Sequence, residues 1–471
     1  MAERFFLAGR WEGSSQELEV LNPYMGLPSR RVFMAQEGHL EEALEAAQGA
    51  GAALAAMASY RRAEVLRRSS QLIEAHREEL ARLISEDNGK PISQSRAEVQ
   101  RAALTFQVAS EEAVRPPGEL LALERNPASE GRWGLLRRFP LGVVLAITPF
   151  NFPLNLVAHK VAPAVAAGCP VVLKPSSKAP TVALRLAGLL KEAGLPDGAL
   201  SVLPMRASLA ERALLDARVR VLSFTGSASV GWRLKALAAE KRVLLELGGN
   251  AGLYIDQGAD LPEAARRLRT GAFSYAGQVC ISVQRVYVHQ SCWEAFLELF
   301  LREVEDIRVG DPLDEATEVG PLVDGEALGR VSAWVQEALQ AGARCLAGGR
   351  AEGRLYLPTV LTGTTEQMKV VCQEVFGPVV VMEPVEGPEE AFRRINASEF
   401  GLQAGVFTPS LSVAWRAFES LQVGAVIIND VPTWRVDHMP YGGTKRSGTA
   451  REGVKYAIQE LTEPRLLVLR P

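Results

Sequence analysis

From residue 141 onward, short apolar strands alternate with helical segments, and this alternation restricts the possible fold more than any other feature of the chain. Strands that are apolar at nearly every position are typical of a parallel sheet covered by helices on both faces. The sequence therefore predicts an α/β fold. The expected strands are VVLAI, PVVLK, ALSVLP, VRVLSF and VLLELGG, and the expected helices cover 155–167, 180–193, 208–216 and 228–239.

A second set of alternating segments begins with GLYI at 252–255 and ends with AVIIN at 425–429. Between them we expect helices over 261–275 and 292–305 on either side of the strand SVQRVYVH. Two such sets, joined without a linker of disordered composition, predict two packed lobes with a cleft between them. Active sites are commonly found in such clefts.

The first 140 residues have different patterns. Amphipathic spacing predicts helices over 40–58, 60–87 and 92–113, and Arg115-Pro116-Pro117-Gly118 is expected to end the last of them. Residues 119–139 favour a pair of strands that projects from the main body.

Charge and cysteine usage argue against several functions. The 52 basic and 55 acidic residues give a net charge of −3, and no basic block indicates nucleic acid or an anionic membrane as a partner. The uncharged stretch 141–158 contains Pro149 and Pro153, which break a membrane helix. Five cysteines without a C-x-x-C pair predict neither a disulfide framework nor a metal site. We expect a protein of the reducing cytoplasm that binds no membrane, nucleic acid or metal.

The segment FTGSASVG at 224–231 follows an expected strand and opens an expected helix. Gly226 allows a close backbone approach, and N–H groups at a helix N-terminus attract a phosphate. Because the segment is not G-x-G-x-x-G, an ordinary glycine turn is an equally good interpretation of it alone.

Three side chains are candidates for chemistry at one carbon atom. Cys280 lies between an expected helix and strand, where a lone cysteine is more often a small buried hydrophobe than a nucleophile. Glu246 and Asn151 each follow the end of an expected strand. Because the carboxyl ends of parallel strands border the ligand crevice, we expect a thiol, a carboxylate and a carboxamide to converge there.

At this point the sequence resembles the aldehyde dehydrogenase superfamily over essentially the whole chain. Six separated segments match in the family's order, so chance similarity is negligible. The segments are TPFNFPLNLVAHKVAPAVAAGCPVVLKPS (148–176), FTGS (224–227), LELGGN (245–250), GQVC (277–280), EVFGP (374–378) and PYGGTKRSGTAREG (440–453).

The resemblance implies a role for each of the three candidates. Cys280 would be the nucleophile that attacks the aldehyde carbon, and Asn151 with the Cys280 backbone N–H would form the oxyanion hole. Hydride transfer to the nicotinamide would leave a thioester, which Glu246 would hydrolyse by activating water. Lys160 and Glu452 match positions that the family sometimes uses as a proton relay, but a helix-face ion pair or cap is an equal alternative.

The resemblance also implies the cofactor-binding residues. Glu374 and Phe376 would position the nicotinamide and its ribose, Lys174 and Ser176 the adenosine ribose, and Ser227 the pyrophosphate. The full expected set is Thr148, Pro149, Phe150, Lys174, Ser176, Ser177, Phe224, Gly226, Ser227, Val230, Leu247, Glu374 and Phe376.

The residue at 177 bears on the choice of cofactor. Many relatives read K-P-x-E where this chain reads Lys174-Pro175-Ser176-Ser177. Their glutamate accepts hydrogen bonds from the ribose and repels a 2′-phosphate, whereas Ser177 and the nearby lysines would accommodate one. The expected cofactor is NADP, alone or beside NAD.

The implied architecture has three parts. Residues 1–118 and 140–248 would form a Rossmann-like NAD(P)-binding domain, and 249–446 a catalytic domain. Residues 119–139 and 459–471 would form an oligomerisation element, in which the apolar run LLVLR (466–470) extends a partner subunit's sheet. A homodimer or homotetramer is therefore expected.

The substrate is expected to be a small aldehyde with a hydroxyl or an anionic group, because CISVQR and RVDHMPYGG resemble the branch acting on lactaldehyde, phosphonoacetaldehyde, glyceraldehyde 3-phosphate or succinate semialdehyde. Val279, where some phosphate- or phosphonate-recognising relatives carry arginine, disfavours a phosphorylated substrate. The expected substrate residues are Arg101, His159, Arg285, Arg435 and His438.

Two alternatives stay open. A CoA-acylating relative would transfer the thioester to a thiol, but that branch tends to lack the glutamate found here at 246. A non-catalytic structural member of the family would need none of Cys280, Glu246, Asn151 and Lys174 together.

Overall fold

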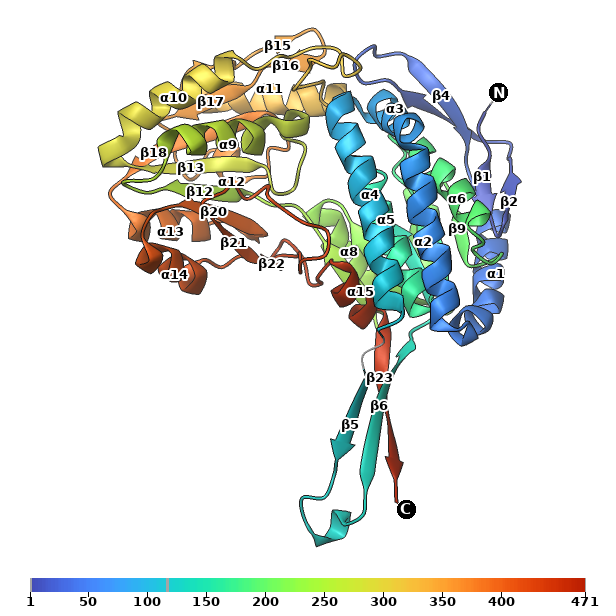
Figure 1. Cartoon of the computed structure of the whole chain (residues 1–471). Coiled ribbons are helices and arrows are strands. Elements are labelled where there is room, and N and C mark those ends of the chain that lie inside the picture. The colour runs from blue at the N-terminus through green and yellow to red at the C-terminus, as the bar shows by residue number, and fades with distance from the viewer. Residues whose placement is uncertain (1, 116–117, 471) are drawn as a thin grey trace.

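A mostly parallel sheet of seven strands carries the first predicted alternation. Its members are β1 (Phe5–Leu7), β2 (Arg10–Glu12), β7 (Val143–Ile147), β8 (Val171–Lys174), β9 (Leu200–Val202), β10 (Val219–Thr225) and β11 (Arg242–Glu246), in the order β11-β10-β7-β8-β9-β1-β2 (Figure 1). The five strands β7 to β11 run parallel, and β1 and β2 extend one edge antiparallel. This computed structural model describes residues 2–115 and 118–470.

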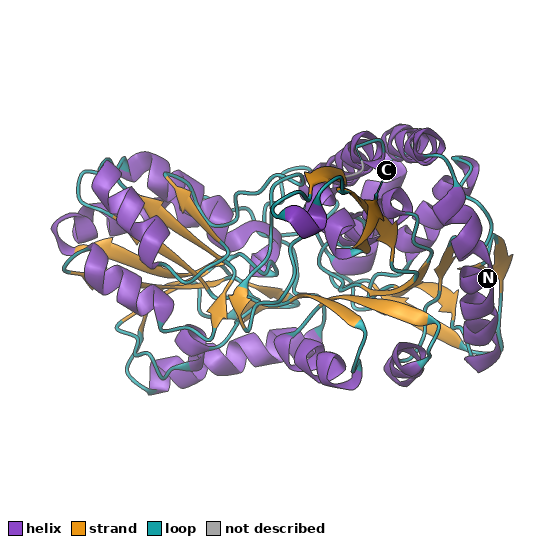
Figure 2. Ribbon diagram, turned by 90° about the horizontal axis from the view of Figure 1, so that it is seen from below, coloured by secondary structure: helices purple, strands orange, loops and turns teal. Residues whose placement is uncertain are grey.

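Helices cover both faces of this sheet (Figure 2). They are α1 (Glu37–Ala56), α2 (Ser59–Ala75), α3 (Arg77–Asn88), α4 (Ile92–Ala113), α5 (Asn155–Ala167), α6 (Thr181–Glu192), α7 (Ala207–Leu215), α8 (Ala228–Leu237) and α15 (Val454–Glu460). All residues of β7 and α5 are buried, which explains their lack of a polar face.

The single helix predicted over 60–87 is wrong, because α2 and α3 are separate helices. The chain leaves helical geometry at His76 (φ −102°, ψ 21°), whose imidazole lies 2.8 Å from the Glu79 carboxylate and 3.1 Å from Arg185 of α6. The helix predicted over 92–113 is confirmed as α4. Pro116 and Pro117, expected to end it, lie outside the described residues.

A second seven-stranded sheet forms the other lobe. It contains β12 (Ala251–Ile255), β13 (Val283–His289), β14 (Arg344–Ala347), β17 (Thr359–Thr362), β18 (Val379–Val385), β20 (Gln403–Phe407) and β21 (Ala425–Ile428), in the order β14-β17-β18-β13-β12-β20-β21. All its neighbouring pairs are parallel except β14 with β17. Its helices are α9 (Leu261–Phe273), α10 (Trp293–Glu305), α11 (Gly325–Gln340), α12 (Lys369–Cys372), α13 (Pro388–Asn396) and α14 (Leu411–Ser420).

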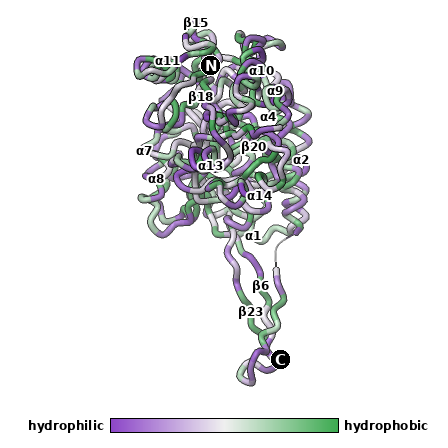
Figure 3. Tube along the Cα trace, turned by 90° about the vertical axis from the view of Figure 1, so that its left-hand side faces the viewer, coloured by the Kyte–Doolittle hydropathy of each residue, from purple (hydrophilic) through white to green (hydrophobic). Residues whose placement is uncertain are grey.

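A three-stranded arm projects from the body (Figures 1 and 3). The predicted strand pair is present as β5 (Gly118–Ala122) and β6 (Trp133–Pro140), and β6 also pairs antiparallel with the C-terminal β23 (Thr462–Leu469). The arm exposes apolar side chains, among them Leu120, Leu135 and Leu467. The remaining short elements are the pairs β3 (Glu17–Leu21) and β4 (Pro28–Phe33), β15 (Ala351–Glu352) and β16 (Leu355–Tyr356), β19 (Phe400–Gly401) and β22 (Thr444–Lys445), and the 3₁₀ turns at Pro127–Ser129, Ser274–Gly277 and Gln290–Cys292.

The two lobes meet where the chain crosses from β11 to β12 in residues 247–250. This crossing joins the carboxyl edge of the first sheet to the amino edge of the second. Within 2–115 and 118–470, every helix is too short or too polar to span a bilayer.

Candidate active site

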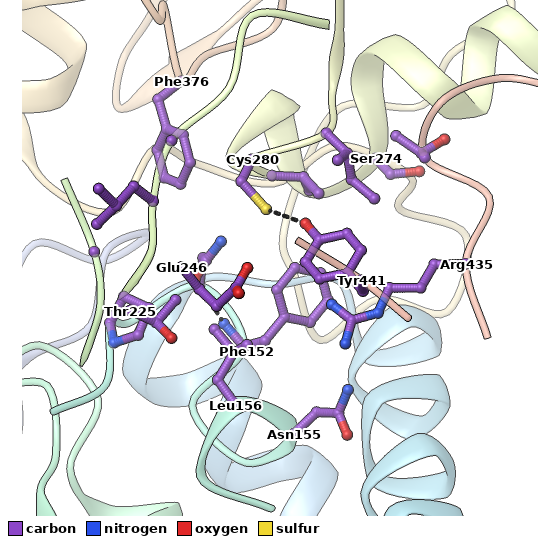
Figure 4. Close-up of a pocket in the computed structure, with 18 of the residues that line it drawn as sticks. Phe152, Asn155, Leu156, Thr225, Glu246, Ser274, Cys280, Phe376, Arg435 and Tyr441 are labelled. Atoms are coloured by element: carbon purple, nitrogen blue, oxygen red, sulfur yellow. Dashed lines mark hydrogen bonds between the residues drawn. The ribbon is translucent and has the colours of Figure 1, made fainter. Parts of the chain in front are cut away.

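A cavity of about 600 Å³ lies between the two lobes (Figure 4). Residues that follow strands of the first sheet line one side of it, and residues that precede strands of the second sheet line the other. Among them are Asn151 after β7, Gly226 and Ser227 after β10, Glu246 at the end of β11, Cys280 before β13, and Glu374 and Phe376 before β18.

Cys280 is placed in the cavity by a sharp turn after α9. Tyr275, Ala276 and Gly277 all have positive φ, at 49°, 51° and 67°. A Cβ at Gly277 would lie 2.1 Å from the Gly377 carbonyl oxygen, so this position requires glycine. Such strain is typical of functional sites.

The Cys280 thiol lies in a poorly solvated place. Its Sγ is 2.9 Å from the Tyr441 hydroxyl, and the dashed line in Figure 4 marks this hydrogen bond. Burial raises the pKa of Cys280 to about 12, although the hydrogen bond with Tyr441 lowers it. The resting group is therefore a thiol, which needs a base before it can act as a nucleophile.

Two N–H donors next to the thiol are available to an oxyanion. Asn151 donates one amide hydrogen to the Gln278 carbonyl at 3.0 Å, which orients the carboxamide and leaves its second hydrogen free. No hydrogen bond to another described residue engages the backbone N–H of Cys280. Paired donors of this kind stabilise the negative oxygen of a tetrahedral intermediate.

Glu246 is a buried carboxylate without a hydrogen-bond partner on either oxygen among the described residues. Burial raises its pKa well above the ordinary value, the neighbouring Glu452 raises it further, and Lys160 and Arg435 oppose both effects. A carboxylate with a raised pKa is a stronger base near neutral pH.

A second cavity of about 20 Å³ lies behind Glu246 and is lined by His159, Lys160 and Glu452 as well. Lys160 donates to the Ser223 hydroxyl at 3.0 Å, and burial lowers its pKa. Lys160 and Glu452 are thus buried beside Glu246, but a relay role for them stays a prediction.

The cofactor residues predicted near the nicotinamide lie together. Pro149, Phe150, Leu247, Glu374 and Phe376 line the main cavity, and the rings of Phe150 and Phe376 meet edge to face at 5.9 Å. The Gly249 backbone N–H donates to the Glu374 carboxylate at 2.9 Å, and burial raises the pKa of Glu374 to about 7.

The residues predicted to hold the phosphates and the adenosine follow the same sheet edge. Gly226 and Ser227 precede the first turn of α8, and a Cβ at Gly226 would lie 2.7 Å from the buried Phe224 ring. Val230, on α8, is exposed. The backbone at this helix end can approach an anion closely.

Beyond β8, Lys174 has a nearly free ammonium. The Thr148 N–H donates to the Lys174 carbonyl at 3.2 Å, whereas Lys174 Nζ reaches, among the described residues, only the Pro175 carbonyl at 3.4 Å. Burial lowers the pKa of Lys174. Ser176 accepts from the Lys178 N–H at 3.2 Å, and Ser177 is exposed. These donor groups suit the hydroxyl and phosphate groups of a dinucleotide.

Two of the five predicted substrate residues line the main cavity. Arg101 holds Asp437 through two hydrogen bonds of 2.9 and 2.8 Å, and Arg435 donates to Glu452 at 2.9 Å. No hydrogen bond within the described residues reaches Nη1 of either arginine.

The structure does not bring the other three to the cavity. Arg285 is buried in β13, where its guanidinium donates to Asn250 and to the Arg394 and Ile395 carbonyls. It is therefore a structural residue, and its prediction as a substrate ligand is wrong. His438 is exposed and is not among the lining residues, and His159 reaches only the small second cavity.

The sequence reasoning missed Asp437 and Tyr441. Burial alone would raise the pKa of Asp437, but hydrogen bonds from His159 and Arg101 hold it well below its usual range. Asp437 thus holds Arg101 at the cavity wall and also contacts His159, whose Nε2 lies 2.9 Å from its carboxylate. Tyr441 belongs to the matched segment PYGG, which was the signal that could have found it. Within the described ranges, no group of three His, Cys, Asp or Glu side chains could hold a metal ion.

Comparison with known proteins agrees with this geometry. The model of the aldehyde dehydrogenase family matches residues 11–467. A 3-sulfolactaldehyde dehydrogenase of Priestia aryabhattai is 43% identical over 465 residues, which is 98% of this chain and 97% of that protein.

Solved structures superpose closely. Aldehyde dehydrogenase 21 from Physcomitrella patens, in complex with the reaction product succinate, has a TM-score of 0.97 and 41% identity, covering 100% of this chain and 98% of that one. Glyceraldehyde-3-phosphate dehydrogenase from Methanocaldococcus jannaschii, complexed with NADP, has a TM-score of 0.93 and 35% identity, covering 97% and 100%. The chain belongs to the aldehyde dehydrogenase family. It is an NAD(P)-dependent aldehyde dehydrogenase, so the fold and enzyme class predicted from the sequence are confirmed.

The crossing between the lobes generates a first prediction. A Cβ at Gly249 would lie 2.1 Å from the Cys280 carbonyl oxygen, so Gly249→Ala must displace the backbone that carries Cys280. We expect aldehyde oxidation to fall by at least about a hundredfold, because a displacement of about 1 Å has that cost. Gly329→Ala, in α11 with nothing within 4 Å of the new Cβ, is the control and should keep wild-type activity. Equal activity of both variants would contradict the prediction.

Proposed function

We propose that this enzyme oxidises a small anionic aldehyde to its carboxylate with NADP or NAD, through a covalent intermediate on Cys280. The observation that carries the proposal is the meeting of three groups from distant segments at one cavity. The Cys280 thiol, the Asn151 carboxamide and the Glu246 carboxylate all line it.

In the first half of the reaction, Cys280 attacks the aldehyde. Glu246 takes the thiol proton through a water molecule, and the thiolate adds to the carbonyl carbon to form a thiohemiacetal. The free N–H groups of Asn151 and of the Cys280 backbone hold the negative oxygen that results. One such donor contributes roughly a hundredfold or more to the rate.

In the second half, the carbon bound to Cys280 would be oxidised to a thioester, and a nicotinamide held by Glu374, Phe376 and Phe150 would supply the hydride acceptor. Glu246 first passes the thiol proton on to water; it then takes a proton from the attacking water molecule, and the resulting hydroxide displaces the Cys280 thiolate to release the carboxylate. Its unpartnered oxygens leave the carboxylate of Glu246 available to both steps.

The residues that would hold the cofactor follow the edge of the first sheet. Glu374, Phe376 and Phe150 would contain the nicotinamide end, and Gly226 and Ser227 the pyrophosphate. Lys174, with its nearly free ammonium, and the exposed Ser177 would meet the adenosine ribose. We infer a preference for NADP, or use of both cofactors, because no carboxylate stands at 177 and the NADP-bound relative of Methanocaldococcus jannaschii shares this fold.

Arg101 and Arg435 support an anionic substrate. Each keeps an N–H group on Nη1, and such groups form strong hydrogen bonds with carboxylate or sulfonate oxygens. The relative from Priestia aryabhattai is named for a sulfonated aldehyde, and the structure from Physcomitrella patens holds succinate. Both compounds carry an anion near the reacting carbon.

We also infer the domain roles and assembly. The first sheet with its helices would be the cofactor domain, the second the catalytic domain, and the arm of β5, β6 and β23 the oligomerisation element of a homodimer or homotetramer. Its exposed apolar side chains, including Leu120 and Leu467, support this because a second copy would cover them. A cytoplasmic location belongs to the same proposal.

The covalent mechanism predicts two different defects. Cys280→Ala should abolish oxidation of every aldehyde while cofactor binding stays nearly intact. Glu246→Gln should form the first equivalent of reduced cofactor more slowly than the wild type, because the thiol has lost its proton acceptor, and should turn over more slowly still, because thioester hydrolysis has lost its base. Wild-type thioester hydrolysis should rise with pH through the raised pKa of Glu246, because only the carboxylate form accepts a proton, and the variant should lose this dependence.

Stopped-flow absorbance of the reduced cofactor, over a range of pH, measures both defects. Wild-type turnover by Cys280→Ala would show that the covalent mechanism is wrong. Adding CoA tests the alternative acceptor, since a CoA-acylating enzyme would require it. Absence of oxidation with any small aldehyde, in wild-type protein that binds the cofactor, would support a structural family member instead.

The cofactor proposal predicts the effect of Ser177→Glu. A carboxylate there would repel a 2′-phosphate and should lower the ratio of kcat/KM for NADP to that for NAD about tenfold or more. Ser412→Glu, an exposed serine on α14 of the other lobe, controls for added charge and should leave the ratio unchanged. Strict use of NAD by the wild type, or an unchanged ratio in Ser177→Glu, would refute this role of residue 177.

The substrate proposal predicts a charge-specific effect of Arg101→Met. The kcat/KM for anionic aldehydes should fall about tenfold to a hundredfold, while neutral aldehydes of similar size change little. Arg96→Met is the matched control on the same helix, because Arg96 pairs with Glu78 and Glu315 at the surface. A clear preference of the wild type for long apolar or aromatic aldehydes would contradict the substrate class.

A further inference from the structure

The phenol of Tyr441 touches the reacting sulfur but has no part in the chemistry above. Its hydroxyl lies 2.9 Å from Cys280 Sγ, and no second hydrogen bond to the described residues engages it. The side chain is 3% exposed. A buried hydroxyl with a single partner is directed at that partner, because leaving it unpaired would cost free energy.

Three contacts fix the position of the Tyr441 ring. Tyr441 and Glu452 form a backbone bridge, in which the Tyr441 N–H donates to the Glu452 carbonyl at 3.0 Å and the Glu452 N–H donates back at 2.6 Å. The Glu452 carboxylate holds Arg435 at 2.9 Å, and the Arg435 guanidinium carbon lies 3.7 Å from the centre of the Tyr441 ring. The three residues thus form a closed loop. Figure 4 shows the Tyr441 hydroxyl directed at Cys280, with Arg435 beside the ring.

We propose that the Tyr441 hydroxyl donates a hydrogen bond to the Cys280 thiolate, and so sets both the pH at which the nucleophile forms and the position from which it attacks. This inference rests on the nucleophilic role of Cys280 proposed above. The proton that leaves Sγ goes to Glu246 through water, and the phenol keeps its own proton throughout.

The charges around the sulfur explain why such a donor matters. Burial opposes formation of the thiolate most strongly, and the carboxylates of Glu374 and Glu452 oppose it as well. The hydrogen bond from Tyr441 and the charge of Arg435 favour the thiolate. Glu246, across the cavity, is the proton acceptor and not a stabilising charge.

Tyr441 is suited to act only as a donor. Burial raises its pKa well above the ordinary value, and the negative charge of Cys280 adds to this effect. The phenol therefore stays protonated through the working pH range. The Arg435 cation over the ring withdraws electron density and strengthens the O–H as a donor.

Tyr441→Phe tests the proposal because it removes the hydroxyl and keeps the ring beneath Arg435. The measurement is the rate of Cys280 alkylation by iodoacetamide across pH 6 to 11, with mass spectrometry identifying the modified residue. We expect alkylation at each pH in this range to slow about tenfold, so that the whole rate profile shifts to higher pH, since a hydrogen bond to a charged group is lost. The pH profile of cofactor reduction in the first turnover should move in the same direction.

Tyr287→Phe is the matched control. Tyr287 is another buried tyrosine in the same lobe, with the Arg394 guanidinium carbon 5.8 Å from its ring centre, and its loss should leave the alkylation profile unchanged. Replacement of Tyr441 by 3-fluorotyrosine, a more acidic phenol of nearly the same shape, should move the profile of Cys280 alkylation to lower pH. This opposite shift keeps the test decisive if Tyr441→Phe does not fold.

An alkylation profile of folded Tyr441→Phe equal to that of the wild type, or a fluorotyrosine profile that does not move, would overturn the proposal. These outcomes are distinct from failure of the covalent mechanism. That failure would appear as aldehyde oxidation by Cys280→Ala, whatever the reactivity of the thiol.

Discussion

The close passage of residues 247–250 beneath Cys280 and Glu374 is the constraint on which the rest of the site depends. A Cβ at Gly248 would lie 2.2 Å from the Glu374 carboxylate, and one at Gly249 would lie 2.1 Å from the Cys280 carbonyl. Two consecutive glycines therefore let the chain leave the first sheet after Glu246 and enter the second sheet. A side chain at either position would collide with Glu374 or with the Cys280 backbone. Glu246 is held at the crossing, and the backbone of Cys280 packs directly against residue 249.

This arrangement brings the carboxyl edge of the first sheet against the amino edge of the second sheet. The first sheet contributes the residues that follow its strands, as expected for a ligand crevice in a parallel sheet. The second sheet contributes residues that precede its strands, among them Cys280 before β13 and Glu374 before β18. Each lobe alone presents half of the polar groups, and the cavity exists only where the two edges meet.

Buried charges on the catalytic side are arranged in neutralising sets. Arg435 with Glu452, and Arg101 with Asp437, place cations and anions in direct contact, while Glu246 lies nearby without a hydrogen-bond partner among the described residues. Removing one member of such a set leaves the other charge buried and is costly. The charges of Glu246, Cys280 and the arginines that line the cavity therefore influence one another. Arg435 contacts both the Glu452 carboxylate and the Tyr441 ring.

The sequence by itself determined the α/β lobes and the family, because apolar strands record burial locally and the matched segments are contiguous words. It also placed Asn151 and Glu246 at strand ends and Cys280 between a helix and a strand. Only the tertiary structure decided what each polar side chain contacts. Arg285 and Arg435 are the same residue type, yet Arg285 donates to oxygen atoms of Asn250, Arg394 and Ile395, whereas Arg435 faces the cavity. Tyr441 meets a sulfur 161 residues away. Such partners depend on how distant elements pack, and no local pattern in the chain records that packing.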